Sequence, residues 1–66
     1  MKVRVNGDER EVPDDLDLAS LIRLLGFRVE GVAAAVNGEV VTRGRQPEHR
    51  LREADRVEVI RAVGGG

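Results

Sequence analysis

The sequence predicts a small α+β domain, in which a mixed sheet of about four to five strands packs on one short helix. Asn-Gly pairs at Asn6-Gly7 and Asn37-Gly38 each follow a segment with strand character, and Asn-Gly is typical of tight hairpin turns. Between the two hairpins, apolar residues recur at helical spacing, which predicts one amphipathic helix; they are Leu18, Leu21, Ile22 and Leu25. A chain of 66 residues has room for one such domain.

The first hairpin has one half-buried strand and one exposed strand. Residues 2–5 alternate polar and apolar side chains, as expected for a strand with one buried face. The return strand, residues 8–12, is mostly charged and is expected at an edge of the sheet, ending at Pro13.

The helix has a start signal and a stop signal. Asp17 is a good N-cap, and Asp14 and Asp15 before it suit the positive end of the helix dipole. Gly26 stands where a left-handed residue is expected to end the helix. Phe27 and Val29 are expected to continue the core beyond it.

The second half of the chain predicts three more strands. Residues 32–36 form an apolar run too short for a helix, and we expect a central strand buried on both faces. Residues 39–41 return from the second turn, and residues 56–60 alternate as a last strand. Residues 43–52 are polar and predict a surface loop with one 3₁₀ turn, anchored by Leu51 alone.

These elements favour a single sheet laid across the helix, because an isolated hairpin is only marginally stable. The residues expected to face the helix are Val3, Val5, Val36, Val57 and Val59. This arrangement is the β-grasp architecture. We assign residues 1–63 to it and residues 64–66 to a flexible glycine tail.

Composition excludes several functional classes. The chain has no Cys and a single His, His49, so thiolate zinc sites, thiol nucleophiles and multi-His metal sites are excluded. A net charge of −1 argues against nucleic-acid binding, and no apolar run approaches a membrane span. A cytoplasmic protein without bound metal or cofactor is expected. A domain this small has little room for an enclosed pocket, so an autonomous enzyme is not expected.

Two polar clusters have ordinary explanations. Helix capping accounts for Asp14, Asp15 and Asp17, and His49 is expected to be solvated in a polar loop. Four arginines in the same loop, with no aromatic residue for base stacking, could steer the protein toward acidic partners; they are Arg43, Arg45, Arg50 and Arg52.

The C-terminal Gly64-Gly65-Gly66 is the most informative feature. Glycines can thread a passage too narrow for any side chain, and three extended residues reach about 10 Å. The α-carboxylate of Gly66 is ionised at neutral pH and unhindered, so it can attack the α-phosphorus of a nucleoside triphosphate. The competing interpretation is an inert end. The position directly after the last strand of a β-grasp domain favours the reactive one.

Along essentially its whole length the chain resembles the bacterial ThiS-type sulfur carriers of thiamine biosynthesis, in the superfamily of ubiquitin-like sulfur carriers. The similarity lies in the Asn6-Gly7 hairpin, the helix end at residues 21–26, and the segments 36–41, 51–60 and 62–66. Two departures are a third glycine, Gly64, where the family usually has another residue, and Ala54, where Gly is common.

The resemblance implies a role as a protein cosubstrate and not a catalyst. A ThiF-type adenylating enzyme would use ATP to convert the Gly66 carboxylate to an acyl adenylate. Sulfur from a cysteine desulfurase or rhodanese relay would then give a thiocarboxylate, and a ThiG-type thiazole synthase would take the sulfur into the thiazole ring. Gly64 and Gly65 would form the access arm.

Docking is expected beside the tail. Ile60 and Ala62 lie opposite Val57 and Val59 in strand phase, so with Val63 they are predicted to contact the partners. Three other functions remain open. The chain could be the small subunit of molybdopterin synthase, an inert β-grasp interaction module, or a protein conjugated to target lysines as ubiquitin is.

Overall fold

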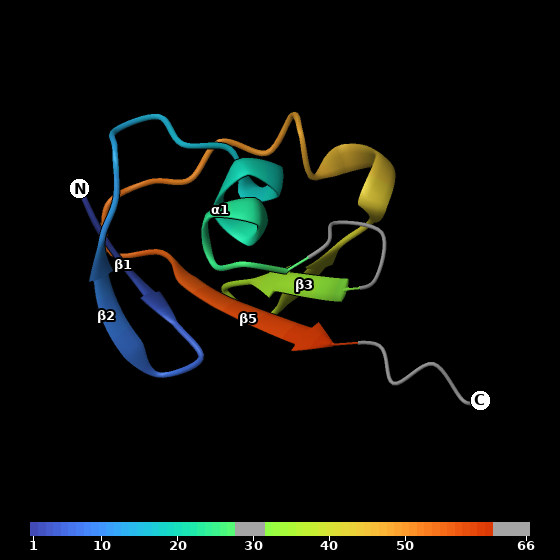
Figure 1. Cartoon of the computed structure of the whole chain (residues 1–66), viewed down its shortest axis with the longest axis horizontal. Helices are drawn as coiled ribbons and strands as arrows, with labels where there is room; N and C mark the ends of the chain where they lie inside the picture. Colours follow the sequence, from blue (N-terminus) through green and yellow to red (C-terminus); the bar gives the residue numbers. More distant parts are fainter. Residues whose placement is uncertain (28–31, 62–66) are drawn as a thin grey trace.

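The computed structural model describes residues 1–27 and 32–61. In chain order the elements are β1 (Lys2–Val5), β2 (Asp8–Glu11), α1 (Leu18–Leu24), β3 (Val32–Val36), β4 (Glu39–Val41), a 3₁₀ turn (Arg43–Arg45) and β5 (Arg56–Arg61). The strands form one sheet in the order β2-β1-β5-β3-β4 (Figure 1). The β1–β5 pair is parallel and the other pairs are antiparallel. The predicted fold, a mixed sheet on one helix, is confirmed.

Both Asn-Gly pairs form the predicted tight turns. The φ angles are 50° at Asn6 and 89° at Gly7, and 51° at Asn37 and 86° at Gly38. Positive φ at both central residues defines the type I′ turn, whose twist matches that of the flanking strands. The charged return strand β2 is exposed throughout and lies at an edge of the sheet, as predicted.

Helix α1 begins at Leu18 because every amide of its first turn has an acceptor. The Leu18 and Ala19 amides donate to the carbonyls of His49 and Gln46 at 2.9 and 3.2 Å. The Ser20 amide donates to the Asp17 carboxylate at 2.9 Å, which confirms Asp17 as the N-cap. Unpaired amides at a helix start would otherwise cost stability, so residues 46–49 are part of the cap.

The helix ends in a Schellman motif. The Phe27 amide donates to the Ile22 carbonyl at 3.2 Å, and the Gly26 amide donates to the Arg23 carbonyl at 2.9 Å. Gly26 has a φ of 91°, as predicted for the residue that ends the helix. Phe27 lies partly buried against the core; Val29 is outside the described residues.

The core lies between the helix and one face of the sheet. Leu18, Leu21 and Ile22 of α1 are fully buried, and Leu25 packs against the core partly buried. The five valines predicted to face the helix are all buried. Within the described residues α1 and the segment that follows β4 lie on the same side of the sheet (Figure 1).

Three expectations need correction. β3 is not buried on both faces: Ala33 is exposed and Ala35 partly exposed, because one short helix covers one face only. Leu51 is not the single anchor of its loop, since Gln46 is 1% exposed. Asp14 does not cap the helix; its carboxylate accepts from the Met1 ammonium at 2.9 Å, and this hydrogen bond raises the pKa of that ammonium.

Candidate functional site

The predicted site begins near the C-terminal end of strand β5. This strand is the middle one of the five, hydrogen-bonded to β1 on one side and to β3 on the other. Of the predicted site residues, Ile60 is described, whereas Ala62, Val63 and the glycines 64–66 lie outside the described residues, as does the predicted domain boundary. The centre of the sheet therefore holds the backbone from which the predicted tail continues.

Ile60 is exposed, as predicted from its strand phase, and it has apolar neighbours. Its side chain is 62% exposed, and it lies opposite Ala33 in the antiparallel β3–β5 pair. Ala35 lies opposite Val40, which is 76% exposed, in the β3–β4 pair. Directly opposed residues share a sheet face, so these four residues form one surface, the outer apolar patch, on the face turned away from α1.

The rest of this outer face is charged. Across β2, β1 and β5 it carries exposed side chains of both signs, with Lys2 opposite Glu11 and Arg4 opposite both Glu9 and Arg56. The outer apolar patch is therefore confined to the part of the sheet formed by β3, β4 and the end of β5. Contiguous exposed apolar surface rimmed by charges is typical of protein interaction sites.

Sequence reasoning found Ile60 but missed the three other members of this patch. Because β3 was expected to be buried on both faces, Ala33 and Ala35 were not predicted to be exposed. A signal was present in the strand itself. Both of its valines fall on the buried face, together with Ala34, whereas the two residues of the other face, Ala33 and Ala35, are small. Val40 lies at the β4 edge, where half of a strand's side chains face away from the core.

The side chains of the two turn asparagines both hold β5. Asn6 accepts from the Val59 amide at 2.9 Å and donates to the Val59 carbonyl at 3.3 Å. Asn37 accepts from the Arg56 amide at 3.0 Å and donates to the Asp55 carboxylate at 3.0 Å. The last strand is thus fixed near both ends by carboxamides from the two hairpin turns.

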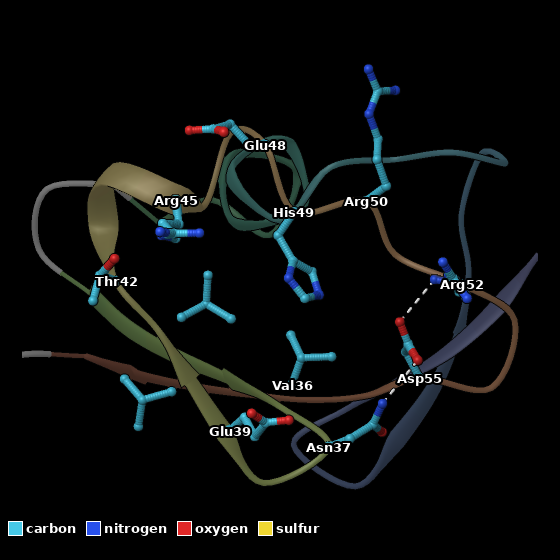
Figure 2. Close-up of a pocket in the computed structure, with 12 residues that line it drawn as sticks. Val36, Asn37, Glu39, Thr42, Arg45, Glu48, His49, Arg50, Arg52 and Asp55 are labelled. Carbon is cyan, nitrogen blue, oxygen red and sulfur yellow. Dashed lines mark hydrogen bonds between the residues drawn. The ribbon is translucent and has the colours of Figure 1, made fainter.

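A pocket of about 870 Å³ lies between the β3–β4 hairpin and the segment that follows it. Figure 2 shows the His49 imidazole pointing into it toward Val36, while the Arg50 side chain points away. Asp55 at its rim is engaged by the Arg52 amide at 2.8 Å and by Asn37. Ile60, the one predicted site residue that the structure describes, does not line this pocket.

Residues 1–27 and 32–61 hold no group of three or more His, Cys, Asp or Glu side chains arranged to bind a metal ion. The one α-helix in this part of the chain is too short to cross a lipid bilayer. The partly exposed His49 contributes its backbone carbonyl to the helix cap. The described residues thus present the outer apolar patch and a last strand that two asparagine side chains fix near both ends.

Comparison with known proteins gives three relevant similarities. The chain is 38% identical over its whole length to a thiazole synthase of Magnetococcus marinus and 29% identical to one of Paramagnetospirillum magneticum. In each case it spans only a fifth of the relative's length. The crystal structure of the thiamine biosynthesis protein ThiS from Geobacter metallireducens superposes with a TM-score of 0.85 at 30% identity, and the match covers all of both chains.

The family comparison covers nearly the whole sequence. The profile of the ThiS family matches residues 3–66, from the first strand through the last glycine. The full-length structural match supports the same assignment. The chain therefore belongs to the ThiS family.

Proposed function

We propose that this protein is a sulfur carrier of thiamine biosynthesis whose reactive group is the carboxylate of Gly66. A ThiF-type enzyme adenylates this carboxylate with ATP, and pyrophosphate leaves. The terminal sulfur of a persulfide on a cysteine desulfurase or rhodanese relay then attacks the acyl adenylate, AMP leaves, and an acyl disulfide joins Gly66 to the relay cysteine. A second thiol attacks that cysteine sulfur and forms a disulfide with it, and Gly66 is released as a thiocarboxylate. The observation that carries this proposal is that the ThiS family match extends through residue 66 and so includes the glycine end.

The folded body supports this proposal through its docking surface. Entry of Gly64, Gly65 and Gly66 into a partner's site costs roughly 1–2 kcal/mol of backbone entropy per residue. Contacts made by the body must offset this cost. The outer apolar patch lies beside the C-terminal end of β5 and offers Ile60 and Val40 for such contacts. Ala62 and Val63, the next residues along the chain, are proposed to extend this docking surface.

The relatives favour a ThiG-type thiazole synthase as the acceptor of the sulfur. Two proteins named thiazole synthase contain a segment similar to this whole chain, and that segment makes up a fifth of their length. Covalent linkage raises the effective concentration of two modules that act on each other. A carrier-like segment within a thiazole synthase is therefore consistent with direct sulfur transfer between the two, and it favours thiamine over molybdopterin synthesis.

In this proposal the protein is consumed and regenerated as a substrate. The chemistry takes place in the partners' sites, and no cofactor is bound by the carrier itself; ATP is bound by the adenylating enzyme. The contribution of this chain is geometric, since it presents an unhindered carboxylate on a narrow arm and holds the base of that arm in a rigid sheet.

The proposal is tested by reconstitution of thiazole formation. The full chain is incubated with ATP, an adenylating enzyme of the ThiF type, a persulfide source with a thiol, and a thiazole synthase together with the substrates that supply the carbon and nitrogen of the ring. Thiazole product is measured by mass spectrometry. We expect product with the full chain and none when Gly66 is deleted. A molybdopterin synthase large subunit replaces the thiazole synthase in a parallel reaction; sulfur transfer only in that reaction would assign the chain to the rival pathway.

A further inference from the structure

Asn6 and Asn37 hold the last strand in the same manner at two different places. Both occupy the first central position of a type I′ turn, with φ angles of 50° and 51°. Asn37 holds the start of β5, at Arg56. Asn6 holds Val59, two residues before the end of β5. The two residues therefore form a natural comparison between the beginning and the end of one strand.

At Val59 the Asn6 side chain takes the place of a missing strand partner. Backbone pairing between β1 and β5 runs through Val5 opposite Val57, and the Asn6 amide donates to the Val57 carbonyl at 2.9 Å. The chain then turns away at Gly7 into β2, whereas β5 continues to Arg61. The Asn6 carboxamide has the same donor and acceptor as a peptide group, and it binds both the amide and the carbonyl of Val59.

We propose that Asn6 is a positioning residue for the sulfur-carrying end of the chain. This inference rests on the proposed function. By clamping Val59, the carboxamide fixes the direction in which the backbone runs on toward Gly66. Without it, the end of β5 would be paired in the sheet on the β3 side only, through Val59 opposite Ala34 and Ile60 opposite Ala33. Added freedom at this end would have to be lost when the tail enters a partner.

The backbone conformation at Asn6 suits few other residues, so a few substitutions separate the effect of the side chain from that of the turn. A φ of 50° favours Gly, Asn and Asp. Of these, Asn alone carries both a hydrogen-bond donor and an acceptor in its side chain at neutral pH. Asn6→Gly therefore keeps the turn and removes the clamp, and Asn6→Asp keeps the acceptor for the Val59 amide and loses the donor. Asn37→Gly is the matched control, with the same change in the same turn type at the other end of β5.

The first readout is amide hydrogen exchange in the full chain, followed by NMR. In Asn6→Gly the Val59 amide is expected to exchange about tenfold faster than in the unaltered protein, as for loss of one hydrogen bond. It is expected to stay close to its original rate in Asn37→Gly, after correction for any change in global stability. Asn6→Asp should retain most of the protection. An unchanged exchange rate of the Val59 amide in Asn6→Gly would show that the Asn6 carboxamide does not protect this amide, and it would overturn the proposal.

The second readout is steady-state adenylation by a ThiF-type enzyme. Asn6→Gly is expected to raise KM about threefold to tenfold at unchanged kcat, because the lost clamp weakens binding and not chemistry. Asn37→Gly should leave both constants unchanged, and Asn6→Asp should restore most of the loss. Equal effects of the two glycine variants would reduce Asn6 to a structural residue and overturn the positioning role.

Failure of this inference is distinguishable from failure of the proposed function. If the unaltered chain is not adenylated, the proposed function falls and the positioning role falls with it, while the Val59 exchange rate still decides whether the clamp exists. If the unaltered chain is adenylated and Asn6→Gly behaves like it, the proposed function stands and the inference about Asn6 is wrong.

Discussion

At the scale of single residues, the turn before β5 contains an alanine in a conformation that suits glycine. Ala54 has a φ of 71°, and its amide donates to the Lys2 carbonyl at 2.7 Å. An L-residue in the left-handed region costs about 1–2 kcal/mol. The departure from the family pattern noted at Ala54 therefore has a physical cost, which the hydrogen bonds of this turn offset.

Ala54→Gly is expected to raise the free energy of unfolding by about 0.5–1 kcal/mol, because relief of the positive φ exceeds the entropy cost of a glycine. Urea denaturation followed by circular dichroism measures the change. Ala33→Gly is the matched control: Ala33 lies in β3 without a positive φ, and its replacement should destabilise the protein. A loss of stability in Ala54→Gly would show that the turn is not strained.

The carboxyl group of Asp17 caps the start of helix α1. Partial burial raises the pKa of this group, but hydrogen bonds from the hydroxyl and amide of Ser20, at 2.6 and 2.9 Å, outweigh burial and lower the pKa below its ordinary value. A lowered pKa in the folded state means that the ionised group stabilises the fold. This contribution is present above the ordinary pKa and is lost as the pH falls through the lowered one.

Asp17→Ala is therefore expected to cost about 1 kcal/mol of unfolding free energy at pH 7, as for loss of a helix cap. The difference from the unaltered protein should shrink as the pH falls into the acid range. Asp17→Asn is the control, since Asn caps helices without titrating there; it should keep most of the stability at pH 7 and depend less on acid pH. A difference between Asp17→Ala and the unaltered protein that stays constant with pH would refute this account of Asp17.

At the scale of elements, the sequence predicted correctly those features that depend on interactions between neighbouring residues. The Asn-Gly turns, the Asp17 cap and the Gly26 stop each depend on a few neighbouring residues, and all were predicted correctly. β3 was misjudged because a short run of Val and Ala has the same pattern whether one face or two are buried. The number of covered faces depends on how many helices the whole chain supplies, and here α1 is the one described.

The buried Gln46 was missed for a related reason. Its carbonyl accepts from Ala19, and its side-chain amide donates to the Val41 carbonyl at 3.4 Å. The first contact joins segments far apart along the chain and the second joins the loop to the end of β4, and a glutamine in a polar loop gives no sign of either. The reactive end stays a prediction: three glycines after the last predicted strand suggested it, and the resemblance to ThiS-type carriers gave Gly66 its proposed role.

The outer apolar patch gives a prediction at the same scale. Ile60→Asp and Val40→Asp are expected to weaken binding to the adenylating enzyme or the thiazole synthase about tenfold or more, since burial of such a side chain contributes roughly 1.5–3 kcal/mol. Leu24→Asp is the matched control: Leu24 is 54% exposed on α1, on the opposite side of the sheet. Isothermal titration calorimetry measures the affinities, and equal effects of the three changes would rule out a specific patch.

At the scale of the whole molecule, we propose a folded body that carries a narrow reactive end. The sheet holds β5 at its centre, and the Asn6 and Asn37 side chains hold that strand near both ends. The outer apolar patch lies beside the end of β5. A body of this kind can bind a partner while a side-chain-free segment extends into the partner's site.

The most direct measurement is intact-mass spectrometry of the full chain after incubation with ATP, an adenylating enzyme of the ThiF type and a persulfide source, followed by fragmentation. The account predicts a mass gain equal to exchange of one oxygen for one sulfur, located at Gly66 and absent when Gly66 is deleted. An unchanged mass with a competent enzyme, or sulfur located at any other residue, would contradict it.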